Sequence, residues 1–272
     1  MLRHTFIHVP GIGLTTERRL WEAGILSWDD LDGSAAAGLP AGRRALLRAH
    51  CGRRLSPRDL AALLPAAQHW RLFPHFRHAA ACLDIETNGA GPWAEEITAI
   101  SLWDGSSLFC FVQGDNLEMF PETVERYEML ITYNGKCFDL PVIERQFGIR
   151  LEQLHLDLRF LLAHLGYKGG LKGCEKRFGL DRGELDGVDG YFAVLLWQEY
   201  LRSGNPRALE TLLAYNVEDT VNLETLMVHA FNLNVAATPF ADRYRLPLPV
   251  RPVHPYRADP LLVGRLKALL QN

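Results

Sequence analysis

The chain has few cysteines and no long apolar run. Its 272 residues include only five Cys, an odd number without a CxxC pair, which excludes a disulfide-stabilised scaffold. No apolar stretch reaches the roughly 18 residues that a membrane-spanning helix needs. The first ten residues carry Arg and His side chains instead of an apolar stretch, so no signal peptide is predicted. Together these absences predict a cytoplasmic protein without a membrane partner.

Lysine is absent from the first 80 residues, and charge is unevenly distributed. This segment holds eleven Arg and six acidic residues, a net charge of +5, whereas residues 81–272 hold 18 basic and 26 acidic residues, a net charge of −8. The total of −3 argues against a protein that coats nucleic acid along its whole length. The asymmetry instead predicts two modules with different partners.

The first part of the chain is predicted to form short helices. A turn with two glycines at 9–14 precedes an amphipathic helix at 15–23. Ser27 has the character of an N-cap that begins another helix. The Ser-Pro pair at 56–57 predicts a further helix, with serine as N-cap and proline at the first position, that reaches about residue 70.

From residue 79 onward the pattern predicts a mixed α/β sheet flanked by helices. Asp104-Gly105 is a hairpin signal between two of the strands. The strands are expected at 79–86, 97–103, 108–113, 128–133 and 154–158, and the main helices at 116–127, 138–147 and 206–231. A connector at 238–260 holds six of the fifteen prolines, and a short helix follows it. This tail has no function that the sequence reveals.

Two acids lie two residues apart in the first expected strand. Asp84 and Glu86 therefore point to the same side of it. Two carboxylates on one side of an otherwise apolar strand repel each other and resist burial, and a divalent cation would relieve both problems. The alternative is a strand end where both acids face water.

Two further acids stand in informative contexts. Asp139 follows an Asn-Gly turn where a strand gives way to a helix, a place where α/β folds often carry sites; the alternative is that it only complements the helix dipole. Asp219 lies four residues after Tyr215 on the longest helix, so the two share a face. The alternative for Asp219 is a solvated position, which is usual for a surface charge.

These residues form an ordered set of motifs. Asp84-x-Glu86, then Asn134 to Phe138-Asp139, then Tyr215-x-x-x-Asp219 resemble the DEDD superfamily of ribonuclease-H-like 3′→5′ exonucleases, in its tyrosine subtype. The segments 170–180 and 196–200 are similar to the middle region of the YprB-like ribonuclease-H-like family. The resemblance covers about residues 79–232, and it implies a ribonuclease-H-like sheet.

The resemblance also implies a two-metal site. Asp84 would bridge both ions, Glu86 and Asp219 would hold the ion that activates water, and Asp139 would support the second ion through water. Tyr215 would orient the attacking water. Carboxylates suit Mg²⁺ or Mn²⁺, and no Cys/His cluster offers a zinc site.

Other side chains are secondary candidates. Thr87 and Asn134 are expected to contact the terminal nucleotide, or to be ordinary strand and turn residues. Asp157, at the end of a strand near the site, is expected in a supporting role. Four cations are expected either to contact phosphate or to form a solvated helix face, namely Lys136, Lys172, Lys176 and Arg177. Two cysteines beside the motifs, Cys82 and Cys137, are expected to pack in apolar surroundings.

The glycine turn near the N-terminus resembles a helix-hairpin-helix motif. In that family Gly11 and Gly13 let the backbone approach phosphate, and N–H groups at the following helix start bind it. Other phosphate donors are expected beyond the turn, namely Thr15, Thr16, Arg18 and Arg19. The alternative is a helical hairpin that docks on the catalytic domain or on a protein partner.

The sequence thus predicts an organisation and a function. A helix-hairpin-helix-like nucleic-acid-binding module is expected at 1–55, a helical linker at 56–78, a ribonuclease-H-like exonuclease domain at 79–232, and a Pro-rich connector with a C-terminal helix at 233–272. The expected function is a 3′→5′ exonuclease that uses two Mg²⁺ or Mn²⁺ ions and acts on DNA in preference to RNA. The alternatives are a non-catalytic nucleic-acid-binding scaffold and a structure-selective endonuclease.

Overall fold

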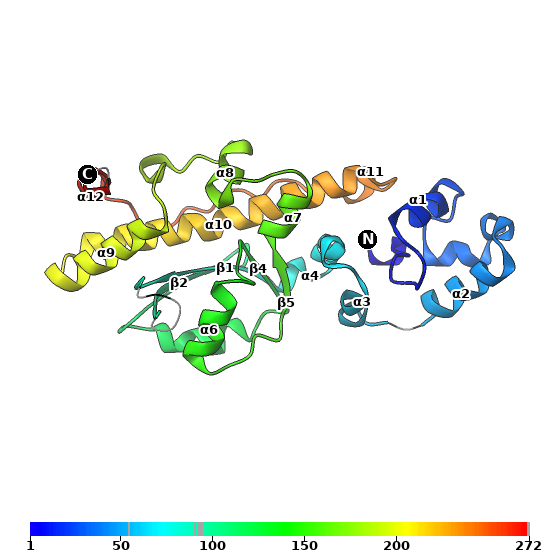
Figure 1. Ribbon diagram of the computed structural model, residues 1–272, viewed down its shortest axis with the longest axis horizontal. Helices are drawn as coiled ribbons and strands as arrows, with labels where there is room; N and C mark the ends of the chain where they lie inside the picture. Colours follow the sequence, from blue (N-terminus) through cyan, green and yellow to red (C-terminus); the bar gives the residue numbers. More distant parts are fainter. Residues whose placement is uncertain (54, 90, 92–94, 271–272) are drawn as a thin grey trace. The chain divides into compact units, whose positions relative to one another are not determined.

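The chain forms two compact units (Figure 1). A computed structural model describes residues 1–53, 55–89, 91 and 95–270. The first unit contains residues 1–77 and 231–246, and the second contains residues 78–230 and the chain from residue 247 on. Residues 56–77 and 231–246, predicted as a linker and as part of a helix and connector, therefore belong to the same unit as residues 1–55.

The first unit is built from short helices, as the sequence predicts. Its α-helices are α1 (Leu14–Glu22), α2 (Ala41–Cys51), α3 (Pro57–Leu63), α4 (Phe73–Phe76) and α11 (Ala241–Tyr244). The unit also contains the 3-10 helices Leu2–His4, which precedes α1, and Trp28–Asp32, Ser34–Gly38 and Ala66–Leu72, which lie between the α-helices. A last 3-10 helix, Arg77–Ala79, leads into the second unit.

The prediction of a helix from residue 56 to about 70 is wrong, because the observed helix is shorter. Ser56 caps it as expected, with its hydroxyl accepting the N–H of Asp59 at 3.1 Å. The helix ends at Leu63, because Pro65 has no N–H to donate and its ring excludes helical geometry at Leu64, which is extended. A second predicted helix, after Ser27, is only a short 3-10 helix.

A buried ion pair fixes the core of the first unit. Arg71 and Glu17 are 2% and 0% exposed, and their closest approach is 2.7 Å. Glu17 also accepts the N–H of Phe6 at 2.7 Å, so α1 is tied to the turn that precedes it. Removal of either partner would leave a buried charge unpaired, which makes this pair a structural anchor.

The second unit contains a five-stranded sheet. The strands are β1 (Ala80–Thr87), β2 (Ile97–Trp103), β3 (Leu108–Val112), β4 (Met129–Thr132) and β5 (Leu154–Asp157). Their order is β3-β2-β1-β4-β5. Because β1 is antiparallel to β2 and parallel to β4, the predicted mixed sheet is confirmed. The predicted hairpin turn at Asp104-Gly105 is also present, closed by the N–H of Asp104 donating to the carbonyl of Ser107.

Helices flank this sheet. They are α5 (Phe120–Val124), α6 (Asp139–Phe147), α7 (Leu158–His164), α8 (Gly170–Arg177), α9 (Gly190–Ser203), α10 (Pro206–Ala236) and α12 (Pro260–Leu270), with 3-10 helices at Leu117–Met119 and Gly183–Leu185. The helix predicted at 116–127 is shorter than expected. Pro121 stands in its first turn and lacks the N–H that an α-helix begun at Leu117 would need.

The alternation of side chains along β1 determines which face of the sheet carries the acids. Leu83 and Ile85 join an apolar core with residues of α5 and α6, among them Phe120 and Val142. Since successive side chains of a strand point to opposite faces, Asp84 and the residues in step with it face the other side, where α10 crosses the sheet (Figure 1).

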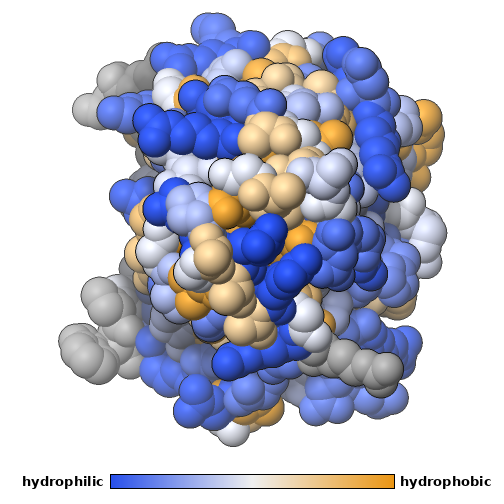
Figure 2. Space-filling model, turned by 90° about the vertical axis from the view of Figure 1, so that its right-hand side faces the viewer, coloured by the Kyte–Doolittle hydropathy of each residue, from blue (hydrophilic) through white to orange (hydrophobic). Residues whose placement is uncertain are grey.

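None of the described helices has the length and apolar character of a membrane span. Hydrophilic residues predominate on the face in Figure 2, and apolar residues are scattered between them.

Candidate metal centre

Three carboxylates converge between the sheet and the long helix of the second unit. Asp84 and Glu86 project from β1, and Asp219 projects from α10. One carboxylate oxygen from each residue lies within 4.8 Å of those of the other two. Glu86 and Asp219 are buried, and Asp84 is half-buried. The structure thus brings together three of the four acids predicted to bind metal.

Asp139, the fourth predicted acid, lies beside this cluster. It is the first residue of α6, and its Oδ1 accepts the N–H of Ile85 at 3.3 Å. Ile85 separates the two acids of β1, so the buried carboxylate of Asp139 borders the same stretch of strand. This position suits a supporting role through water, which stays a prediction.

Burial and mutual repulsion disfavour negative charge at this site. The pKa of Asp84 is raised well above its ordinary value, first by burial and then by the charges of Asp219, Asp139 and Glu86. The pKa of Glu86 is raised in the same way, by burial and then by Asp219, while Lys172 opposes the shift. The cluster therefore has a strong electrostatic demand for a cation.

The donor set fits a hard divalent cation. All three converging ligands are carboxylates, and no His or Cys belongs to this group within the described residues. Oxygen ligands of this kind suit Mg²⁺ and Mn²⁺ rather than zinc. The predicted cofactor class therefore matches the chemistry of the residues that could hold it.

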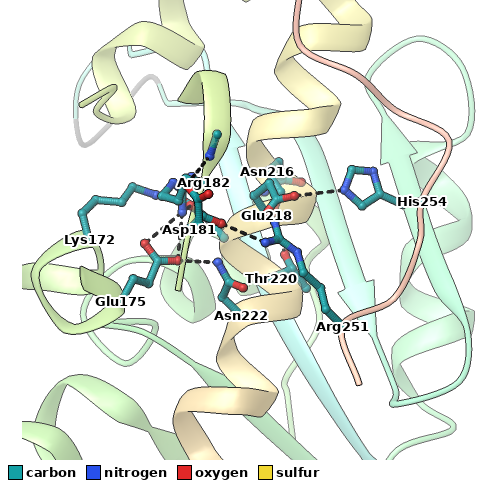
Figure 3. Close-up of polar contacts among 12 residues, drawn as sticks. Lys172, Glu175, Asp181, Arg182, Asn216, Glu218, Thr220, Asn222, Arg251 and His254 are labelled. Atoms are coloured by element: carbon teal, nitrogen blue, oxygen red, sulfur yellow. Dashed lines mark hydrogen bonds and ion pairs between the residues drawn. The ribbon is translucent and has the colours of Figure 1, made fainter. Parts of the chain in front are cut away.

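Two cations approach the helix side of the cluster (Figure 3). Lys172 on α8 and Arg182 both form ion pairs with Asp219. They also lie over the ring of Tyr215, at 4.6 and 5.4 Å from its centroid. Arg182 is 4% exposed and pairs with the buried Glu175 at 2.9 Å. The sequence indicated Lys172 only as a phosphate contact or a solvated charge, and gave no sign of Arg182 or Glu175.

Asn216 is a second residue that the sequence did not reveal. It lies on α10, is fully buried, and its Nδ2 donates to Asp84 Oδ2 at 2.8 Å. One turn later, Thr220 lies 3.5 Å from the carbonyl of Ser101 on β2. These contacts fix the rotation of α10 against the sheet, and Asn216 orients the carboxylate of Asp84. Its place beside Tyr215 in the third motif was the available signal.

Tyr215 is a buried phenol beside the acids. It is 2% exposed, and its pKa is raised, first by burial and then by the charge of Asp219. The phenol hydroxyl therefore stays protonated at neutral pH. It can donate a hydrogen bond and orient a group, but it is no base.

Asp157 supports the loop that precedes α6. Its carboxylate accepts the backbone N–H groups of Asn134 at 2.8 Å, Lys136 at 3.1 Å and Arg159 at 3.0 Å. Asn134 has a φ of 69°, the left-handed region that Asn tolerates better than most residues. Three N–H bonds to one buried carboxylate hold this loop in place, which gives Asp157 a structural role.

The remaining candidates are less closely tied to the acids. Thr87 is buried, and its hydroxyl donates to Glu95 Oε1 at 2.5 Å. Lys136, Lys176 and Arg177 are exposed. Cys82 is buried as expected, whereas the packing predicted for Cys137 is wrong, because it is exposed in the loop that reverses direction before α6.

The glycine turn of the first unit exposes the residues predicted to bind nucleic acid. Gly11 has a φ of 76°, Gly13 is the N-cap of α1, and Thr15, Arg18 and Arg19 are exposed on this helix. Only a three-residue 3-10 helix and a turn precede the glycines. The helix-hairpin-helix assignment and its contacts stay predictions.

The raised pKa of Asp139 predicts a pH dependence in the metal-free protein. Burial and then the charges of Asp157 and Asp219, against two backbone hydrogen bonds, raise this pKa from 3.8 to about 7. Between these pH values Asp139 keeps a proton in the folded protein that it has lost in the unfolded chain, so its contribution to stability falls as pH rises and levels off above about pH 7.

Asp139→Asn should remove this fall, because asparagine does not ionise. Measured by chemical denaturation in EDTA, the stability of the variant relative to wild type should increase from pH 4.5 to 7 and then stay constant. A pH-independent difference between the two proteins would contradict the assignment of this titration to Asp139.

The chain is similar to known proteins over its second unit. Residues 81–231 match the sequence model of the RNase_H superfamily. Over 112 residues the chain is 32% identical to the uncharacterized protein YprB of Bacillus subtilis (strain 168). This match covers 37% of this chain and 27% of YprB. Among solved structures, the family B DNA polymerase of the hyperthermophilic archaeon Pyrobaculum calidifontis is similar over 58% of this chain and 24% of the polymerase, at 14% identity and a TM-score of 0.44.

Proposed function

Because the chain belongs to the RNase_H superfamily, we propose that its acidic cluster is the two-metal centre of a nuclease that hydrolyses phosphodiester bonds. The observation that carries this proposal is the convergence of Asp84, Glu86 and Asp219 within 4.8 Å. Bound Mg²⁺ or Mn²⁺ would supply an activated water and neutralise the charge that develops on the phosphate and the leaving oxygen.

Each side chain has a distinct part in this proposal. Asp84, oriented by the amide of Asn216, would hold both ions, and Glu86 and Asp219 would hold the one near the attacking water. Asp139 would support the second ion through water from its position beside β1. Three of these carboxylates are brought together by strand alternation and by the placement of α10, so little rearrangement is needed to bind a cation.

Tyr215 is proposed to position the attacking water. Its buried, protonated hydroxyl can hydrogen-bond a water without competing for its proton, since a phenol with a raised pKa is a poor base at pH 7. Tyr215→Phe keeps the ring that packs under Lys172 and removes only the hydroxyl. We expect it to lower kcat with little change in KM or thermal stability.

The finer proposal is a 3′→5′ exonuclease that prefers DNA. The order of the acidic motifs and the tyrosine four residues before the last acid support the exonuclease assignment. The Arg-rich first unit supports a nucleic-acid substrate, with DNA favoured by its glycine turn. Thr87 and Asn134 would contact the terminal nucleotide from their places at the end of β1 and after β4.

The experiment uses end-labelled substrates of several shapes. Single-stranded and duplex DNA and RNA, labelled at the 5′ end, are incubated with the full chain in Mg²⁺ or Mn²⁺. A ladder that shortens one nucleotide at a time is expected, with blocked 3′ ends resistant. Internal fragments would instead indicate a structure-selective endonuclease, and intact substrates with both ions would favour a binding scaffold.

The glycine turn gives a separate prediction about affinity. Arg18→Ala/Arg19→Ala should weaken binding to duplex DNA and flatten its salt dependence by up to about two units of log Kd per log salt, about one for each lost phosphate contact. Fluorescence anisotropy from 50 to 300 mM salt measures this slope. Arg126→Ala/Arg150→Ala, which removes two exposed arginines of the second unit, is the matched control, and equal slopes in both variants would contradict the prediction.

A further inference from the structure

The Pro-rich tail is anchored to the helix that carries Tyr215 and Asp219. Residues 247–259, here called the strap, contain no helix or strand and have proline at four positions. Proline fixes φ and removes N–H donors, which favours an extended chain without internal hydrogen bonds. The polar groups of the strap must therefore find partners in water or in other segments of the chain.

Several of these partners lie along α10. The N–H of Arg257 donates to Glu210 Oε1 at 3.2 Å, and the N–H of Asp259 donates to Thr211 Oγ1 at 3.0 Å. Further along the helix, His254 Nε2 lies 3.1 Å from Glu218 Oε1. Beyond the strap, α12 places Leu262, Val263 and Leu266 in the apolar core with α9. The strap is thus fixed at both its middle and its end.

Arg251 makes the most informative contact of the strap (Figure 3). Its guanidinium forms an ion pair with the buried Glu218 and donates to the carbonyl of Asp181 at 2.8 Å. Glu218 directly precedes Asp219, and Asp181 directly precedes Arg182. Since Arg182 and Asp219 form their own ion pair, two adjacent cross-links join the same loop to the same turn of α10.

The guanidinium suits this double contact. Its planar fork presents several N–H groups at fixed angles, so it reaches a carboxylate and a carbonyl at once, which a single ammonium does less well. Together with His254, Arg251 pairs both oxygens of Glu218. Without Arg251, the loop would lose the bridge that this side chain forms between it and α10, next to the point where Arg182 meets Asp219.

We propose that Arg251 is a positioning residue for the metal centre: through Glu218 and Asp181 it keeps Asp219 and Arg182 in the arrangement that receives metal. The proposal rests on the function proposed above and assigns the strap to it. Among the described residues, no hydrogen bond or ion pair joins the strap to the converging carboxylates, so its effect passes through the turn of α10 and the loop at 181–182.

The test compares two arginines of the same tail. Arg251→Ala removes the strap contact, and Arg265→Ala removes an ion pair of α12 with Glu199 at 3.0 Å, away from the metal centre. Arg251→Ala is expected to weaken Mn²⁺ binding by about 10-fold or more, the size usual for partners that orient metal ligands, and to lower kcat with KM for nucleic acid unchanged. Calorimetric Mn²⁺ titration, steady-state kinetics and thermal melts supply the three readouts.

Two further variants sharpen the test. Arg251→Lys should restore part of the affinity, because it keeps the charge but not the fork. Glu218→Gln should reproduce the loss, and adding it to Arg251→Ala should change little more, since both act through one contact. If Arg251→Ala does not fold, the comparison of Arg251→Lys with Arg265→Lys replaces it.

The outcomes separate the two proposals. The role of the strap would be overturned if Arg251→Ala bound Mn²⁺ as tightly as wild type, or if Arg265→Ala lost as much affinity as Arg251→Ala. Either result would leave the proposed nuclease function intact. Additive effects of Arg251→Ala and Glu218→Gln would also overturn it. Failure of the wild-type chain to bind Mn²⁺ would remove the metal centre, and the strap's role with it.

Discussion

Replacing Asp84 by asparagine should abolish phosphodiester cleavage and make the metal-free protein more stable. The variant loses the carboxylate proposed to hold both ions, so we expect activity to fall about 1,000-fold or more. Stability should rise by about 1–2 kcal/mol, because an amide of the same shape ends the repulsion with Glu86 and Asp219. The amide oxygen can still accept the hydrogen bond from Asn216.

Thermal and chemical denaturation in EDTA measure the stability, and the end-labelled assay measures the activity. Asp115→Asn removes an exposed acid of the same unit and serves as the matched control, with both quantities near wild type. A less stable Asp84→Asn protein would contradict the proposed repulsion. Cleavage by Asp84→Asn at the wild-type rate would contradict the assignment of Asp84 to the metal centre.

The second large effect is expected for Asp219→Asn, with the opposite sign for stability. Activity should again fall about 1,000-fold or more, since a metal ligand is lost. The metal-free protein should lose about 2–4 kcal/mol, because Arg182 is 4% exposed and, among the described residues, keeps only Glu175 as a charge partner. Lys172, about one-third exposed, can turn to water at little cost.

The same denaturation experiments decide this point. Asp219→Asn should unfold at a lower denaturant concentration than wild type, whereas Asp84→Asn should unfold at a higher one. Arg182→Met/Glu175→Gln, which removes the buried cation together with its remaining carboxylate partner, should recover part of the stability in the Asp219→Asn background without recovering activity. Equal stability of Asp84→Asn and Asp219→Asn would show that the ion pairs at Asp219 are not structural.

Much of the site followed from local patterns. Asp84 and Glu86 share one side of β1 because strand side chains alternate, and Tyr215 and Asp219 share a face of α10 because they are four residues apart. The mixed sheet and the ribonuclease-H-like class are both confirmed. These features depend on periodicity and on the order of motifs, which a sequence displays directly.

The unpredicted parts depend on contacts between distant segments. Arg182 lies in a loop with no periodic pattern, and only the fold places it beside Asp219. Arg251 looked like one charge in a Pro-rich tail, although it reaches back 33 residues to Glu218. The early end of α3 was predictable in principle, since Pro65 disfavours helical geometry in the residue before it.

The uneven distribution of charge along the sequence corresponds to the two structural units. The acidic second unit concentrates carboxylates at the proposed metal centre, which would need cations before it could accept a phosphate backbone. The arginines of the first unit supply positive charge, with Arg18 and Arg19 exposed after the glycine turn. Two modules of opposite charge explain a total of −3 in a chain proposed to act on nucleic acid.

The most direct measurement is a time course of cleavage of a 5′-labelled oligonucleotide in Mn²⁺, with wild type and Asp84→Asn prepared in parallel. A stepwise ladder is predicted for the wild-type chain, no product for Asp84→Asn, and no product for either protein in EDTA. An intact substrate with the wild type, or equal cleavage by both proteins, would contradict the assignment of the acidic cluster as a nuclease centre.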